Sequence, residues 1–239
     1  IPITLINAFL SAEDKNFYKH FGIDLIAIFR ASIRNIYNKL ADNKLNRLIG
    51  ASTITQQVVK NLLLSNEISF ERKIKEMILA IRLEIILSKN KILELYLNDI
   101  YLGYGSYGVA VASLNYFNKS LQDLEPEEMA YLASLPKAPN NYNPKTKYSQ
   151  AIERRNWVLD RMLVNGFIKI DDQIFYKKKK LIVEDRYENK FEEAKYFKEE
   201  VRKQLNNLFG SQKLYSQGFI VKTTIDTKIQ KIADEVFIN

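Results

Sequence analysis

The sequence predicts a mainly α-helical fold, and three observations support this. Apolar residues recur at helical spacing along most of the chain. Glycine and proline, at 8 and 5 residues, are scarce for a fold rich in turns. Serine, threonine or aspartate precedes several apolar segments, as is typical of residues that cap a helix N-terminus. With 239 residues, 46% of them apolar, the chain is long enough to bury a full core.

The expected helices follow one another with short polar breaks. Asp24, Thr53, Ser69 and Ser88 are candidate N-caps, and Gln56 completes the spacing of a capping box with Thr53. The expected helices cover residues 2–13, 25–40, 52–64, 69–87, 88–100, 109–117, 126–135 and 148–164. After residue 170 the chain becomes highly charged, which predicts a solvated helical connector, and residues 219–225 alternate like a strand.

Composition limits the classes of partner and chemistry. The formal charge of +8 suits nucleic acid, an acidic membrane surface or a phosphate-bearing substrate, although simple solubility explains it equally well. The absence of cysteine excludes disulfides, thiolate metal sites and a cysteine nucleophile. No apolar run reaches the roughly 18 residues that a membrane-spanning helix needs. The sequence begins and ends within helical patterns, so we expect a piece of a longer protein, in which missing targeting segments say little about location.

Two segments have alternative interpretations. The helix over 25–40 combines an apolar face with basic residues, which fits either a helix packed on the core or one lying on a membrane. The stretch GYGSYG over 103–108 matches a dinucleotide-binding fingerprint, but that motif requires a preceding strand. Because the preceding residues predict a helix, we expect no nucleotide at this loop and interpret its glycines as a tight turn.

Carboxylates are the main candidates for acid–base chemistry, because His20 is the only histidine. Glu13 and Asp14 end a helix whose other side is apolar, and aromatic residues follow them. A carboxylate in such a place tends to have a raised pKa and can act as a base. The alternative is a helix end with a satisfied pair of acids.

A second carboxylate lies among cations on the helix over 69–87. Arg72 and Lys73 are within one turn of Glu76, which suits a phosphate group, although a solvated helix face has the same pattern. The start of the helix over 52–64 adds hydrogen-bonding and basic side chains at Ser52, Gln57 and Lys60. Helix N-termini of this kind suit anions and sugar hydroxyls.

These segments together closely resemble the peptidoglycan glycosyltransferase domain of class A penicillin-binding proteins, glycosyltransferase family 51. Five signatures occur in order over residues 1–166: EDKNFYKHFGID, GASTITQQVVKN, RKIKEMILAIRLE, KILELYLNDIYLGYGSYGV and EEMAYLASLPKAPNNYNP. The resemblance implies a lysozyme-like fold with a large helical lobe and a smaller jaw over about 25–68, within a domain of residues 1–170. It also implies that 171–239 is a connector leading to a transpeptidase domain outside this sequence.

The resemblance further implies an activity, partners and a location. The expected enzyme is an inverting glycosyltransferase that polymerises lipid II into β-1,4-linked glycan and releases undecaprenyl pyrophosphate. Its partners are lipid II, the growing glycan chain and the bacterial cytoplasmic membrane, at whose outer face it works, and neither nucleic acid nor nucleotide is expected. The jaw contacts the membrane in this family, which favours the membrane interpretation of 25–40. The phosphoglycolipid moenomycin is an expected inhibitor.

The same resemblance assigns roles to the candidate residues. Glu13 matches the catalytic base, and Glu76 matches a second glutamate that assists departure of the leaving group, directly or through a divalent cation. No cofactor is obligatory, and magnesium or manganese at Glu76 is the only metal it allows. The expected substrate-binding residues are Ser52, Gln57, Lys60, Arg72 and Lys73. Lys44 and Arg47 lie in a mobile loop that is longer than usual in the family, and they are expected to supply basic contacts.

Two rival functions remain. A lysozyme-like hydrolase or lytic transglycosylase shares the expected fold and cleaves peptidoglycan with one or two carboxylates. The cations beside Glu76 argue against it, because a hydrolase has no pyrophosphate to bind. A non-enzymatic basic module for nucleic acid or membrane is the second rival, but the charge is spread along the chain and no nucleic-acid motif is present.

Overall fold

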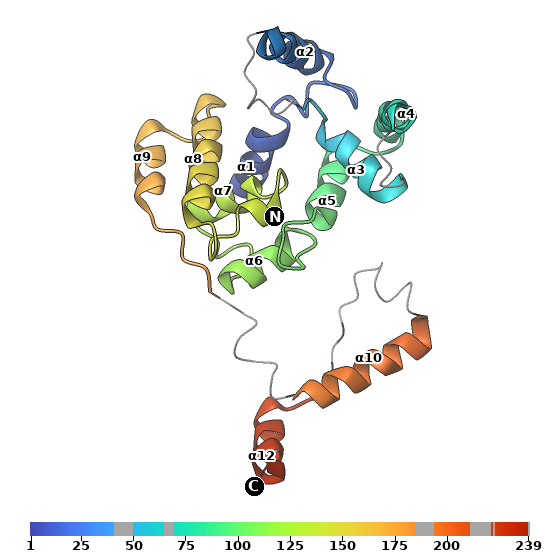
Figure 1. The fold of residues 1–239 in the computed structure, drawn as a ribbon, viewed down its shortest axis with the longest axis vertical. Helices are drawn as coiled ribbons and strands as arrows, with labels where there is room; N and C mark the ends of the chain where they lie inside the picture. The colour runs from blue at the N-terminus through green and yellow to red at the C-terminus, as the bar shows by residue number, and fades with distance from the viewer. Residues whose placement is uncertain (41–49, 65–68, 185–193, 211–220, 222, 239) are drawn as a thin grey trace. The chain divides into compact units, whose positions relative to one another are not determined.

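The protein is described here from a computed structural model that covers residues 1–40, 50–64, 69–184, 194–210, 221 and 223–238. It is mainly helical and forms two compact units, residues 1–184 and 185–239 (Figure 1). The first unit contains α1 (Ile3–Glu13), α2 (Leu25–Leu40), α3 (Ile54–Leu63), α4 (Phe70–Ile86), α5 (Lys89–Asp99), α6 (Val109–Phe117), α7 (Pro126–Ser134), η1 (Pro139–Asn141), α8 (Tyr148–Val164) and α9 (Ile170–Lys178). The second unit contains α10 (Lys195–Phe209) and α12 (Thr227–Ile238). None of the helices in the described ranges is long and apolar enough to cross a bilayer.

The expected helices are confirmed to within about two residues at most ends, because their caps form as predicted. The Thr53 hydroxyl accepts a hydrogen bond from the Gln56 amide, and the Gln56 side chain accepts one from the Thr53 amide, which completes the capping box. Asp24 caps α2 by accepting a hydrogen bond from the Ala27 amide at 2.8 Å. Ser69 and Ser88 cap α4 and α5 in the same way.

The strand predicted over 219–225 is wrong for the part of it that the structure describes. Val221 and residues 223–225 have no strand conformation. A strand requires a neighbouring strand to take up its backbone hydrogen bonds. In the described residues, β structure is limited to isolated bridges, between Phe21 and Ile23 and between Tyr101 and Tyr107.

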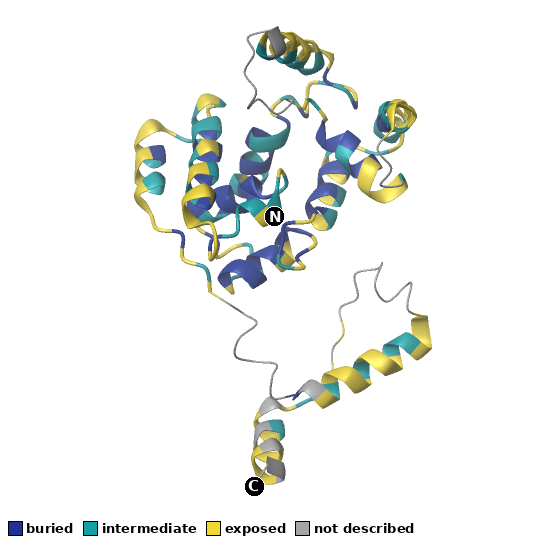
Figure 2. Cartoon of the chain, in the orientation of Figure 1, coloured by how far each residue is buried: buried dark blue, intermediate teal, exposed yellow. Residues whose placement is uncertain are grey.

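The core of the first unit surrounds α1. This helix packs against α7 and α8, while α3 packs against α4 and α5. Leu5, Ala8 and Phe9 on α1 are fully buried. Figure 2 shows the buried residues gathered on α1, α5, α6 and α7. The end of α1, which carries Glu13, is therefore fixed by a rigid centre.

The apolar face of α2 is exposed and not packed on the core (Figure 2). The exposed apolar residues of α2 are Leu25, Ile26, Phe29, Ile33, Ile36 and Tyr37. A helix packed on the core would bury such a face, so the interpretation of 25–40 as a core-facing helix is wrong. Contiguous exposed apolar surface of this kind marks an interaction site.

The glycine-rich loop joins α5 to α6 and uses its own backbone groups. The Ser106 amide donates to the Gly103 carbonyl at 2.8 Å, and the Gly108 amide donates to the Ile100 carbonyl at 2.9 Å. Gly108 has φ +79°, and a Cβ atom there would lie 2.4 Å from the Asn98 carbonyl oxygen. A helix precedes this loop, where a dinucleotide-binding fingerprint requires a strand, so the loop is a tight turn and not a phosphate cradle.

The glycines of this loop allow a stability test. We expect Gly108→Ala to lower the free energy of unfolding by about 3 kcal/mol, because it adds a backbone overlap to a strained left-handed conformation. Gly105 is the matched control, since it has φ +64° but open space where a Cβ atom would lie. Gly105→Ala should therefore cost only about 1 kcal/mol. Urea unfolding of both variants measures the difference, and equal losses would contradict the role of the Asn98 contact.

Candidate active site

Glu13 ends α1 in the wall of an open cleft of about 540 Å³. The cleft reaches from α1 across α2 and the start of α3 to α8. Gln57 of α3 donates a hydrogen bond from Nε2 to Glu13 Oε2 at 2.9 Å. Burial raises the pKa of Glu13, and the Gln57 hydrogen bond and the positive charge of Arg154 only partly oppose this effect. A carboxylate with a raised pKa is a stronger base once it is ionised.

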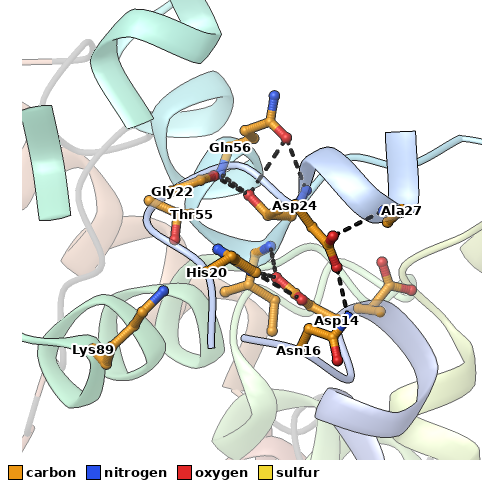
Figure 3. A network of polar contacts seen from close by, with 12 residues as sticks. Asp14, Asn16, His20, Gly22, Asp24, Ala27, Thr55, Gln56 and Lys89 are labelled. Carbon is orange, nitrogen blue, oxygen red and sulfur yellow. Dashed lines mark hydrogen bonds and ion pairs between the residues drawn. The ribbon is translucent and has the colours of Figure 1, made fainter. Parts of the chain in front are cut away.

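Asp14, the next residue, ties the end of α1 to the start of α3. His20 Nε2 lies 2.9 Å from Asp14 Oδ2, and the Ile54 amide donates to the same oxygen at 3.0 Å. Figure 3 shows Asp14 facing His20, and Asp24 reaching toward Asn16 and Ala27. The only histidine of the chain thus holds a carboxylate in place. The network keeps Glu13 within reach of Gln57.

A second polar cluster joins α4 to the segment before α3. The buried Glu76 carboxylate is bound by Lys73 Nζ at one oxygen, and Arg72 Nη1 lies 3.5 Å from the other. Lys73 Nζ also donates to Ser52 Oγ at 2.9 Å. Arg72 Nε is buried and has no hydrogen-bond partner among the described residues. The structure therefore brings Ser52, Arg72, Lys73 and Glu76 together.

The segment Gly50–Ser52 separates two hollows. One is the cleft that contains Glu13. The other, of about 350 Å³, contains Lys73 together with the apolar side chains Ile28 of α2 and Met77 of α4. Ser52 lines both hollows, so the candidate base and the cationic cluster meet at this segment.

Three of the predicted site residues are not placed at this cluster. Lys60 is exposed on α3, and in the described part of the chain it has no hydrogen bond or ion pair to the Arg72–Glu76 cluster. Lys44 and Arg47 lie outside the described residues. Their predicted substrate contacts stay predictions.

Side chains of α8 border the cleft, although sequence reasoning did not select them as site residues. The Arg154 guanidinium stacks 3.8 Å from the centre of the Trp157 ring. Trp157 and Arg161 line the Glu13 cleft, and Trp157 also lines a neighbouring hollow of about 550 Å³ with Lys137 and Tyr142. Arg154, Trp157 and Arg161 share one helix face by their spacing, and this stripe was the available signal.

Comparison with known proteins identifies the family. A family model described as Transglycosylase matches residues 1–163. The chain belongs to the transglycosylase family. Its mainly helical fold is consistent with the lysozyme-like transglycosylase domain that the five signatures predicted. The family is one of glycosyltransferases, so the expectation of an enzyme is confirmed.

Individual relatives of this transglycosylase domain are penicillin-binding proteins. It is 45% identical over 236 residues to penicillin-binding protein 1A of Rickettsia bellii, covering 98% of this chain and 30% of that protein. It is 43% identical over 242 residues to penicillin-binding protein 1A of Escherichia coli, covering 100% of this chain and 27% of that protein. The crystal structure of penicillin-binding protein 1A from Haemophilus influenzae is 34% identical, with a TM-score of 0.46, and the match covers 76% of this chain and 24% of that chain. The chain thus spans less than a third of the length of these relatives.

Proposed function

We propose that this transglycosylase domain polymerises lipid II into β-1,4-linked glycan strands of the bacterial cell wall and releases undecaprenyl pyrophosphate. The observation that carries the proposal is the pairing of two sites across Gly50–Ser52. One is a half-buried glutamate with a raised pKa, and the other is a carboxylate held between two cations. A base and an anion site are the two groups that sugar transfer from a pyrophosphate requires.

Glu13 acts as the general base in this proposal. Gln57 holds one carboxylate oxygen, and the described residues donate no second hydrogen bond to the side chain. The free oxygen takes the proton from the 4-hydroxyl of the acceptor GlcNAc as that oxygen attacks C1 of the donor MurNAc. The bond between C1 and the pyrophosphate oxygen breaks on the opposite side, so the configuration at C1 inverts.

Arg72 and Lys73 stabilise the leaving group. As the C1–oxygen bond breaks, negative charge grows on the undecaprenyl pyrophosphate, and preformed cations are worth most where charge develops. The Arg72 guanidinium and the Lys73 ammonium are the donors that we assign to it. Ser52 positions the pyrophosphate between them. Lys60, Lys44 and Arg47 are proposed to contact substrate on the strength of the sequence signatures alone.

A divalent cation at Glu76 fits the described residues poorly. Lys73 and Arg72 already occupy both oxygens of the Glu76 carboxylate. No group of three histidine, aspartate or glutamate side chains suited to a metal occurs in the described ranges. We therefore derive no step through a metal, and assign neutralisation of the pyrophosphate to the two cations.

The substrate lipid places the site at a membrane surface, and we propose the outer face of the bacterial cytoplasmic membrane. The exposed apolar face of α2 supports this, because it is large and unpacked and lies on a helix that also carries arginines. Apolar side chains of α4 are also exposed, namely Ile74, Ile78, Ile81 and Ile85. An undecaprenyl chain leaving the hollow beside Ile28 and Met77 would meet these surfaces.

The rival function is lytic cleavage of peptidoglycan. Incubating the chain with labelled lipid II, and separately with preformed glycan, distinguishes the two. We expect polymer from lipid II and no shortening of the preformed glycan. Shortening without polymer formation would support the lytic enzyme instead.

The pH dependence of polymerisation tests the environment of Glu13. Because the pKa of Glu13 is raised, the acidic limb of kcat/KM should lie above the ordinary glutamate range, with activity lost as pH falls through it. The Gln57 hydrogen bond favours the ionised carboxylate, so Gln57→Ala should move this limb to still higher pH. Gln150→Ala, in the neighbouring hollow, should leave the limb in place. A limb that does not move in Gln57→Ala would contradict the assignment of Glu13 as the base.

A further inference from the structure

The hollow of about 550 Å³ next to the Glu13 cleft has no part in the mechanism above. This α8 hollow is formed by the loop of the fifth signature and by α8, and Trp157 lines both the hollow and the cleft. The fully buried Tyr131 donates its hydroxyl to the Tyr142 carbonyl at 2.9 Å, which fixes the loop to the core. The α8 hollow therefore has a firm wall that reaches the site of sugar transfer.

The charged side chains of the α8 hollow are mainly cations. Lys137, Lys147 and Arg154 line it, against one carboxylate, that of Glu153. Lys147 Nζ donates to the neutral side chain of Asn141 at 3.3 Å, and no ion pair forms on Lys147 or Arg154 in the ranges that the structure describes. Burial lowers the pKa of Arg154, because the charged guanidinium has lost part of its hydration. An anionic ligand would compensate for that loss, so the hollow suits an anion.

The aromatic rings of the α8 hollow are not bare platforms for a neutral sugar. The Arg154 guanidinium lies 3.8 Å from the centre of the Trp157 ring and 6.0 Å from the centre of the Tyr142 ring. A guanidinium this close to a ring is held there by attraction to the ring face, which it covers. A ligand that approaches these rings therefore meets a positive charge.

The proposed substrate has anionic groups of two kinds. Its pyrophosphate is assigned to Arg72 and Lys73. Its stem peptide, which branches from the MurNAc ring, has free carboxylates and one side-chain ammonium. Three cations and one carboxylate complement a peptide of that composition. Because the peptide is attached to a sugar that reacts beside Glu13, it can pass from the cleft into the α8 hollow along Trp157.

We infer that the α8 hollow binds the stem peptide of the substrate through its carboxylates, with Lys147 and Arg154 as the main contacts. This inference rests on the proposed function, because it takes lipid II as the substrate. It also gives a role to the fifth signature, whose loop forms one wall of the hollow. Peptide bound outside the sugar cleft leaves C1 and the 4-hydroxyl free to meet at Glu13. The hollow thus contributes to substrate affinity and not to bond formation.

The test combines two substrates with two double variants. One substrate is lipid II with its natural stem peptide, the other is lipid II whose stem carboxylates are amidated, and both are supplied in detergent micelles without phospholipid. For the wild type we expect amidation to raise the KM about tenfold, with kcat within twofold. Lys147→Gln/Arg154→Gln should raise the KM for natural lipid II by about the same factor, and amidation should then raise it no further. Arg82→Gln/Lys178→Gln removes two exposed cations outside the three hollows, and this matched control should behave like the wild type.

Comparison of the two substrates separates the α8 hollow from Glu13. Arg154 also opposes the rise in the pKa of Glu13, so its substitution can change turnover, but that change acts on both substrates alike. Equal KM values of the wild type for the two substrates would overturn the inference and leave the proposed function standing. A double variant that still discriminates between the substrates as the wild type does would also overturn it, because the peptide would then be bound elsewhere. Absence of polymer with wild-type protein would instead defeat the proposed function itself.

Discussion

Glu13→Gln is expected to abolish glycan polymerisation while leaving the binding of lipid II largely intact. Glutamine keeps the shape of the side chain and can still accept a hydrogen bond from Gln57, but it cannot take the proton of the acceptor hydroxyl. Removal of a general base typically lowers the rate by about 10²- to 10⁴-fold. Initial rates of polymer formation from labelled lipid II, together with a binding titration of the same substrate, measure the two effects separately.

The control for this variant is Glu94→Gln, which removes an exposed carboxylate of α5 that pairs only with Lys91 among the described residues. A surface pair of that kind contributes little to stability, so its activity should stay within about twofold of wild type. Turnover of Glu13→Gln near the wild-type rate would remove Glu13 from the mechanism. Loss of lipid II binding in parallel with turnover would show that the carboxylate acts in binding and not in proton transfer.

Lys73→Ala is expected to have the second largest effect, a fall in kcat on the order of 10²-fold. The substitution removes a donor to the leaving pyrophosphate and also frees one oxygen of the buried Glu76 carboxylate. The affinity for moenomycin should fall as well, because its phosphate would use the same cations. Polymerisation kinetics and inhibitor titration measure both consequences, and Arg72→Ala should act in the same direction.

Lys75→Ala is a closely matched control, two residues along α4. Lys75 pairs with Glu71 on the exposed side of the helix, where the ion pair is solvated. We expect unchanged kinetics and inhibitor affinity in this variant. Loss of turnover in Lys73→Ala with unchanged moenomycin affinity would mean that Lys73 supports the position of Glu76 without touching phosphate.

Much of the fold could be predicted from the sequence, because its helices have local signals. Thr53, Ser69 and Ser88 cap their helices by hydrogen bonds from amides three residues away, and such contacts depend only on nearby residues. The grouping of Arg72 and Lys73 around Glu76 could be predicted equally well, since all three lie within two turns of one helix. The prediction of a strand over 219–225 is wrong for the described residues, because strand formation depends on a distant partner that local alternation does not reveal.

The contacts between distant segments explain what sequence reasoning missed. Gln57 reaches Glu13, and Lys73 reaches Ser52, only because α3 and α4 pack together beside α1. The substrate-binding roles of Ser52, Gln57 and Lys73 were predicted only from the resemblance of the five signatures to a known family. The sequence analysis assigned no role to Arg161. This residue lines the same cleft as α2 because α8 packs against α1, and no local sequence pattern indicates that packing.

The fully buried Arg155 ties the interior of the first unit to residues beyond the last signature motif. Its guanidinium donates to the carbonyls of Lys177 and Lys179 at 3.0 and 2.7 Å, so the end of α9 serves as its counterpart. Cutting the chain at residue 170, or where the family match ends, would leave a charged group in the interior without these acceptors. The interior of this unit thus depends on backbone groups past the last signature motif, as far as residue 179.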